Sequence, residues 1–268
     1  MSDITLVTAL YDINRGKNGD GRSFDEYLSW FKDTLKVSSP MVVYVDESLK
    51  EFVEGERGSR PTRIITQTLD KVPYYYLNKE IDDILQSKEY QDKIGAPNRV
   101  ECKMSLYNVI IYSKFKWMKF AVEENYFDSS YFMWMDAGLS RFFGGISNQY
   151  PSENAKETLL DTKDNILIQT SMSYYPDLVE ADTCSEDYFW DARTWVMAGL
   201  WGGGKDIMLK FCDAMDDIFV NKMIKNKVIN NEQNAMAYLY KNNPDMFIAF
   251  ENYAHMHRQY ELIQELSK

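Results

Sequence analysis

The sequence is short of the residues on which many redox and metal sites depend. Only three of its 268 residues are cysteine, Cys102, Cys184 and Cys212, and only two are histidine. The cysteines include no close pair, which argues against a disulfide framework or a zinc cluster and favours a reducing compartment. Because His255 and His257 both lie near the end of the chain, catalytic triads that need histidine have few options.

Long apolar runs and an excess of positive charge are missing as well. No stretch has the apolar length of a membrane span, and the N-terminus lacks the basic start and apolar run of a signal peptide. The formal net charge is −11, whereas proteins that bind polyanions usually show a basic excess. We therefore expect a cytoplasmic protein with no transmembrane segment and no nucleic-acid partner, which could still dock at a membrane through another protein.

Apolar, β-branched runs alternate with helical patterns in the first half of the chain. Ser23 and Glu26 form a capping box at the start of the first helix. Strands are predicted at 4–9, 41–46, 63–66, 131–136, 166–170 and 195–200. Helices are predicted from Ser23, from about Ser48, at about 77–92, 103–125, 205–225 and 231–243, and from about 253. This alternation predicts an α/β fold with a mostly parallel central sheet flanked by helices, in a single domain over 1–268.

Asp136 is the most informative candidate for a ligand-binding role. It ends a strand of large apolar residues, and ligands of open α/β sheets bind at the carboxyl ends of strands. The carboxylate could ligate a divalent cation, and the small residues Ala137 and Gly138 would let a nucleotide approach the backbone. A turn or helix-capping aspartate explains the spacing equally well.

A glycine-rich segment in the second half of the chain resembles a phosphate-binding loop at first sight. Gly199, Gly204 and Lys205 have the required spacing, but Asp206 stands where Ser or Thr should hold magnesium. The sequence therefore disfavours a nucleoside triphosphatase. We expect instead a flexible floor where the backbone approaches a sugar, with Trp201 as a stacking surface; a plain strand-to-helix turn is the alternative.

Acidic and histidine side chains late in the chain complete the set of candidates. Glu232 lies in the first turn of a predicted helix, next to Gln233, and a carboxylate there often serves only the helix dipole. His255 and His257 flank Met256, and one of them could bind a metal, although a surface histidine is the commoner explanation.

Five short segments, spread in order over most of the chain, carry a further signal. They are 5–15 (TLVTALYDINR), 113–115 (SKF), 132–141 (FMWMDAGLSR), 196–203 (VMAGLWGG) and 231–233 (NEQ). Together they resemble the HtrL/YibB family and, more broadly, glycosyltransferases of the GT-A fold. The resemblance implies a GT-A-like fold with a Rossmann-like, nucleotide-binding half at about 1–140 and an acceptor-binding half at about 141–268.

The same resemblance implies an activity and roles for individual residues. The enzyme would move a sugar from a nucleotide-sugar donor, a UDP-sugar by family analogy, to a glycan, a lipid-linked saccharide or another hydroxyl acceptor. The donor-binding residues would be Thr8, Ala9, Tyr11, Arg15, Lys114, Asp136, Ala137 and Gly138. The acceptor-binding residues would be Gly199, Trp201 and Gly202, and the catalytic residues Glu232 and Gln233.

The metal motif departs from the GT-A pattern. The usual Asp-x-Asp reads Asp136-Ala137-Gly138, so the second carboxylate is missing. Mn²⁺ or Mg²⁺ would be held by Asp136 together with His255 or His257. The departure motivates the alternative of a non-catalytic carbohydrate- or nucleotide-binding protein. A sugar-phosphate nucleotidyltransferase ranks lower, because the glycine-rich, Arg-containing loop of such enzymes does not follow the first strand.

Overall fold

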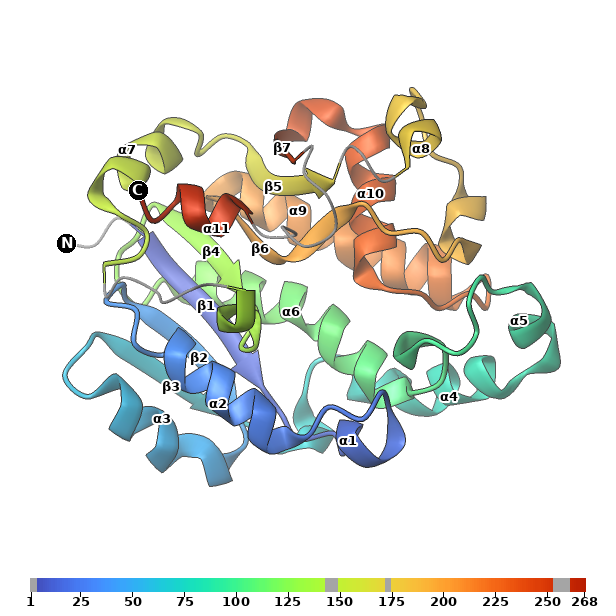
Figure 1. Cartoon of the computed structure of the whole chain (residues 1–268), viewed down its shortest axis with the longest axis horizontal. Helices are drawn as coiled ribbons and strands as arrows, with labels where there is room; N and C mark the ends of the chain where they lie inside the picture. Colours follow the sequence, from blue (N-terminus) through green and yellow to red (C-terminus); the bar gives the residue numbers. More distant parts are fainter. Residues whose placement is uncertain (1–3, 143–148, 172–174, 253–260) are drawn as a thin grey trace.

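In the computed structural model, which describes residues 4–142, 149–171, 175–252 and 261–268, seven strands form one sheet (Figure 1). Its strand order is β3-β2-β1-β4-β6-β5-β7, and β6 alone is antiparallel to its two neighbours. The strands are β1 Ile4–Leu10, β2 Met41–Val45, β3 Thr62–Thr66, β4 Tyr131–Met135, β5 Ile166–Ser171, β6 Val196–Gly204 and β7 Phe247–Asn252. The predicted α/β class with a mostly parallel sheet is confirmed.

Helices cover both faces of this sheet. They are α1 Arg15–Asn18, α2 Phe24–Thr34, α3 Lys50–Arg57, α4 Asn78–Gln86, α5 Lys88–Lys93, α6 Ser105–Glu124, α7 Glu153–Asp161, α8 Pro176–Glu180, α9 Lys205–Asp217, α10 Glu232–Asn242 and α11 Glu261–Glu265. Short 3₁₀ turns lie at Glu47–Leu49, Leu69–Lys71, Tyr75–Leu77, Val100–Cys102, Leu139–Phe142, Glu186–Trp190 and Pro244–Met246, and a π-helical turn, Ile218–Ile224, extends α9. Within the described ranges, no helix combines the length and apolarity that a membrane crossing needs.

Two apolar cores form because side chains alternate along each strand. In β4, Phe132 and Trp134 join the core under α4, α6, α9 and α10, whereas Tyr131, Met133 and Met135 join the core under α2, α3, α7 and α11. The inner strand β1 therefore lies between the long helix α6 and the amphipathic helix α2 (Figure 1). The two cores fix the carboxyl ends of β1 and β4 side by side.

Local sequence signals explain most of the element boundaries. The capping box at the start of α2 is present, with Ser23 accepting from Glu26 N and the Glu26 carboxylate accepting from Ser23 N. The single helix predicted at 77–92 is two helices, since Ser87 adopts an extended conformation and caps α5 through Tyr90 N.

Several elements were not predicted from the sequence. The polar loop after β1 contains the one-turn helix α1, and α7 and β7 had no predicted counterpart. The tail from about 253 was predicted to be helical; 253–260 lie outside the described residues, and α11 lies within the remainder of that tail. β7 pairs with β5 at the edge of the sheet, so its existence depends on a partner about 80 residues away rather than on a local pattern.

The glycine-rich segment is not a loop, which corrects the sequence-based prediction. Gly202, Gly203 and Gly204 belong to β6 and pair with β4. A Cβ on Gly202 would lie 2.8 Å from Met133 Cγ and 3.0 Å from the Phe132 carbonyl oxygen. Gly202 thus makes room for the bulky side chains of β4, whereas Gly203 and Gly204 lie against Ile166 and Lys163, and a flexible floor for a sugar does not form there.

Candidate active site

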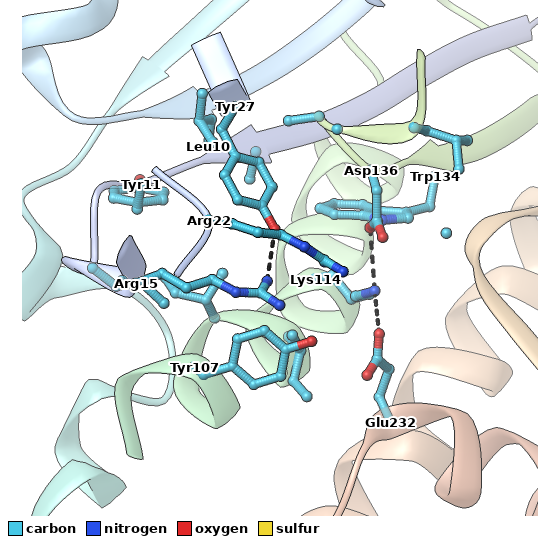
Figure 2. A pocket seen from close by; sticks show the side chains of 18 of the residues that line it. Leu10, Tyr11, Arg15, Arg22, Tyr27, Tyr107, Lys114, Trp134, Asp136 and Glu232 are labelled. Carbon is cyan, nitrogen blue, oxygen red and sulfur yellow. Dashed lines mark hydrogen bonds and ion pairs between the residues drawn. The ribbon is translucent and has the colours of Figure 1, made fainter. Parts of the chain in front are cut away.

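A pocket of about 290 Å³ opens at the carboxyl edge of the sheet (Figure 2). Its walls come from the segment after β1, from α2 and α6, from the turn after β4, and from the first turn of α10. Because β6 runs opposite to β4, its first half reaches the same edge, where Gly199 O accepts a hydrogen bond from Asp136 N at 2.9 Å. The pocket lies where ligands of open α/β sheets bind.

A buried ammonium group joins two carboxylates at one end of this pocket. Lys114 Nζ donates to Glu232 Oε1 at 2.6 Å, to Asp136 Oδ1 at 3.2 Å and to the Ala198 carbonyl oxygen at 3.2 Å. The Lys114 and Glu232 side chains are only 3% and 5% exposed, whereas that of Asp136 is 42% exposed. Residues from α6, from the end of β4 and from α10 therefore meet at one charged centre, as Figure 2 shows.

The electrostatic environment of this centre is unusual for charged groups. Burial lowers the pKa of Lys114, but the charges of Asp136 and Glu232 outweigh it and hold the pKa above its ordinary value. Burial, with the charge of Asp136, raises the pKa of Glu232 despite the pairing with Lys114. Glu232 Oε2 is buried and accepts no hydrogen bond from the described residues, although the side chain lines the pocket. One carboxylate oxygen is thus committed to Lys114, while the other is buried without a hydrogen-bond partner among the described residues.

Asp136 is held by the strand that carries it. Trp134 Nε1 donates to Asp136 Oδ1 at 2.6 Å, and this oxygen also accepts from Lys114. Trp134 itself is part of a stack of rings under the pocket in which Tyr11 lies on Trp117, Trp117 on Trp134, and Trp134 on Trp201, with centroids 5.4, 6.5 and 6.1 Å apart. These stacked aromatic rings form the floor of the pocket.

Guanidinium groups lie on the other side of the pocket. Arg15 makes a two-pronged ion pair with Asp20, donates to Tyr27 Oη at 2.6 Å and lies 4.7 Å above the Tyr107 ring. Arg22 shares Asp20 with it at 3.5 Å, and Figure 2 shows the Arg22 side chain pointing into the pocket toward Asp136. Cationic groups therefore face the Lys114 centre across the pocket, in a protein whose net charge is −11.

Arg141 is a further cation in the pocket wall, and it lacks a carboxylate partner within the described part of the chain. Its guanidinium lies over the rings of Trp30 and Phe142, at 5.0 and 4.6 Å. Neither Arg22 nor Arg141 was assigned a role from the sequence, because no periodic pattern marks them. Arg141 closes one of the segments that carried the family resemblance, which is the only signal that could have found it.

The structure brings together most of the residues singled out in the sequence. The pocket is lined by Ala9, Tyr11, Arg15, Lys114, Asp136, Ala137, Gly138, Gly199, Glu232 and Gln233. Their proposed roles in donor binding, acceptor binding and catalysis stay predictions.

Three of the predicted residues do not lie in the pocket wall. Trp201 is completely buried and packs between Trp134 and Phe211, so it offers no stacking surface to a sugar, which corrects the prediction. Gly202 and Thr8 are also buried in their strands and do not line the pocket. His255 and His257 lie outside the described residues.

Of the predicted metal ligands, Asp136 lies in the described pocket wall, where Asp12 and Glu232 also contribute carboxylates. The Asp136 side chain is 42% exposed, and its Oδ2 makes no hydrogen bond with another described residue. No group of three or more histidine, cysteine or acidic side chains in the described ranges could hold a metal alone. Mg²⁺ and similar ions are often bound by one or two carboxylates plus substrate phosphates and water. The site therefore fits a cation that arrives with a phosphate-bearing ligand.

The fold and the pocket define an α/β protein with a charged pocket at the carboxyl edge of its sheet. The model of the HtrL_YibB family, described as "Bacterial protein of unknown function", matches residues 2–258. The chain belongs to this family, as the order of its motifs indicated.

Relatives place the chain among known proteins more loosely. The chain is 27% identical over 101 residues to Protein HtrL of Escherichia coli (strain K12). This match covers 35% of this chain and 35% of that protein, so the chain spans about a third of the relative's length.

Solved structures also show likenesses. Mouse xyloside xylosyltransferase 1, in its apo form, has a TM-score of 0.49 and 7% identity, covering 92% of this chain and 85% of that chain. The 4-diphosphocytidyl-2C-methyl-D-erythritolsynthase from Anaerococcus prevotii DSM 20548 has a TM-score of 0.40 and 8% identity, covering 99% and 97%. Likenesses this distant do not bear on activity or substrate.

Proposed function

We propose that this protein is a glycosyltransferase that moves a sugar from a nucleotide-sugar donor, a UDP-sugar by family analogy, to the hydroxyl of a glycan or lipid-linked saccharide. The observation that carries the proposal is the Lys114 ammonium held between Asp136 and Glu232, in a pocket whose facing side presents arginines. A nucleotide-sugar has the matching chemistry, with an anionic diphosphate beside a sugar rich in hydroxyl groups.

The arginine side of the pocket suits the diphosphate. Arg22 is only partly paired and Arg141 has no carboxylate partner in the described residues, so both can donate charge-assisted hydrogen bonds to phosphate oxygens. The leaving nucleoside diphosphate gains negative charge as the anomeric bond breaks. Cations already fixed beside it would stabilise that charge without reorganising at the moment of reaction.

A divalent cation, Mn²⁺ or Mg²⁺, would be held by Asp136 and the diphosphate and would neutralise part of that charge. Lys114 is bound to Asp136 Oδ1 and keeps this carboxylate beside the pocket. His255 or His257 could add a ligand.

Glu232 suits the acceptor side of the reaction. Its Oε2 is buried and without a hydrogen-bond partner in the described residues, so an acceptor hydroxyl that entered the pocket could donate to it. A carboxylate in this position can orient the hydroxyl and take its proton as the new bond to the sugar forms. Gln233 also lines the pocket and can donate a hydrogen bond to a sugar oxygen.

A panel of nucleotide-sugars, each with and without Mn²⁺, tests the proposal by thermal shift. A ligand held at about 100 times its dissociation constant should stabilise the fold by about 2.7 kcal/mol. Ligands that bind are then incubated with the protein, and free nucleoside diphosphate is measured. Release of the diphosphate supports a transferase, binding without release supports the non-catalytic binding protein, and no binding by any nucleotide-sugar contradicts the transferase.

A further inference from the structure

Glu101 is a buried carboxylate that the proposed chemistry does not use. It lies in the 3₁₀ turn Val100–Cys102 just before α6, is 4% exposed and is absent from the pocket wall. Its carboxylate pairs with Arg99 and accepts a hydrogen bond from Asn231 Nδ2 at 3.3 Å. Burying a carboxylate costs desolvation free energy. The specific hydrogen-bond partners of Glu101 therefore point to a role in fixing neighbouring groups in place.

Asn231, the partner of Glu101, is the N-cap of α10. Its Oδ1 accepts from Gln233 N at 3.0 Å, and its own backbone N donates to Asn230 Oδ1 at 2.8 Å. The two ends of the Asn231 amide group are therefore both committed, one to the first turn of α10 and one to Glu101. Glu232 follows Asn231 directly in the chain, so the conformation of this cap determines the position of the Glu232 Cα and the direction of its side chain.

A second bond ties the same turn to α6. Tyr112 Oη donates to the Asn230 carbonyl oxygen at 3.0 Å, and Tyr112 is two residues from Lys114. Lys114 on α6 and Glu232 on α10 form the shortest ion pair of the charged centre. The chain segments that carry them are joined by the hydrogen bonds at Asn230 and Asn231. The 2.6 Å contact between Lys114 and Glu232 depends on how these helix segments are held together.

We propose that Glu101 and Asn231 are positioning residues that hold Glu232 against Lys114. Glu101 fixes the Asn231 amide, Asn231 fixes the first turn of α10, and this turn delivers Glu232 to the pocket. What the positioning is for rests on the proposed function, whereas the positioning itself does not. Neither residue touches the pocket, so a ligand would not contact them directly.

The test uses the variant Asn231→Asp and the swapped double variant Glu101→Gln/Asn231→Asp. Aspartate caps a helix as well as asparagine does, so the single variant keeps the cap but sets a second carboxylate against Glu101. The double variant restores one amide and one carboxylate in exchanged places. Asn154→Asp, at an exposed position in the first turn of α7, adds the same charge without touching the contact and serves as the control.

We expect Asn231→Asp to lower the turnover number by roughly 10- to 100-fold at an unchanged KM for the donor, since small misplacements near the chemistry have effects of this size. The double variant should recover most of the rate. A loss of rate that merely follows the fraction of folded protein, or a double variant no better than the single one, would overturn the proposal.

A second measurement does not need activity. The ammonium ¹⁵N–¹H signal of buried Lys114, assigned by its loss in Lys114→Met, should be visible in the wild-type protein, shifted or lost in Asn231→Asp, and restored in the double variant. An unchanged signal in folded Asn231→Asp overturns the positioning role. If the wild-type protein transfers no sugar but the signal behaves as expected, the proposed function fails and the positioning role stands.

Discussion

The two oxygens of Glu232 have different surroundings, and this difference leads to a prediction for Glu232→Gln. The amide can still accept from Lys114 but cannot take a proton from an acceptor hydroxyl. We expect donor affinity to change little and the transfer rate to fall by about 10²- to 10⁴-fold, the usual loss for a general base. Rates are compared per folded molecule, with exposed Glu157→Gln on α7 as the control. A normal rate with a lowered melting temperature would make Glu232 a structural residue.

Asp136 is bound to Lys114 and is the more exposed of its two carboxylate partners, which gives a second prediction. Calorimetric titration of a nucleoside diphosphate should show tighter binding with Mn²⁺ than with chelator, and Asp136→Ala should remove the difference. Asp206→Ala, an exposed aspartate in the first turn of α9, should keep it. Equal affinities of the wild-type protein in both conditions would remove the metal from the proposal.

The three cysteines provide a prediction on thiol chemistry. All three are free, and burial raises the pKa of each, that of half-buried Cys184 to about 11. Because the thiolate is the reactive form, native Cys184 should react slowly at pH 7 and faster as the pH rises toward 11. A thiol reagent should count three groups after unfolding without reductant. A count of one would reveal a disulfide.

At the residue scale the sequence predicted the charged centre better than its surroundings. Asp136 and Glu232 were singled out by their places at a strand end and a helix start, and Lys114 by the family resemblance alone; the fold brings the three into contact. Trp201 was misjudged, because a tryptophan beside glycines looks the same whether it faces solvent or a packed strand. Burial depends on which side of β6 meets α9, and local sequence does not encode that.

The elements themselves lead to a test of the β6 strand. Gly202→Ala should destabilise the fold by about 1–3 kcal/mol, because the added methyl would overlap Met133 and the Phe132 carbonyl group. Gly55→Ala, inside helix α3, meets no atom within 4 Å and should be neutral or stabilising by up to about 1 kcal/mol. Urea unfolding of both variants gives the comparison. Equal stabilities would mean that β6 tolerates side chains at this position.

Element prediction succeeded where the pattern was local and failed where it was not. The strands β1, β2, β3, β4 and β5 were placed from apolar runs, and their bounds agree to within a residue or so. The direction of β6 could not be predicted, since a strand's neighbours are chosen by the path of the whole chain. That direction matters for function, because it brings Gly199 to the pocket and takes Gly202, Gly203 and Gly204 away from it.

At the scale of the whole molecule, one sheet connects the residues expected to bind donor and acceptor. β4, from the first half, pairs directly with β6, from the second half. The pocket draws its charged centre from both sides of this junction, with Lys114 and Asp136 on one side and Glu232 on the other. The division at about residue 140 into a nucleotide-binding and an acceptor-binding half stays a prediction.

The stack of rings under the pocket gives the molecule a built-in optical reporter. Three of its six tryptophans, Trp117, Trp134 and Trp201, lie in a single column, and Trp134 donates directly to Asp136. Excitation energy can transfer among indoles this close, so a ligand that disturbs Trp134 would alter the fluorescence of all three tryptophans. Unlabelled protein should therefore signal occupancy of its pocket through intrinsic fluorescence, and Trp134→Phe should silence most of that signal.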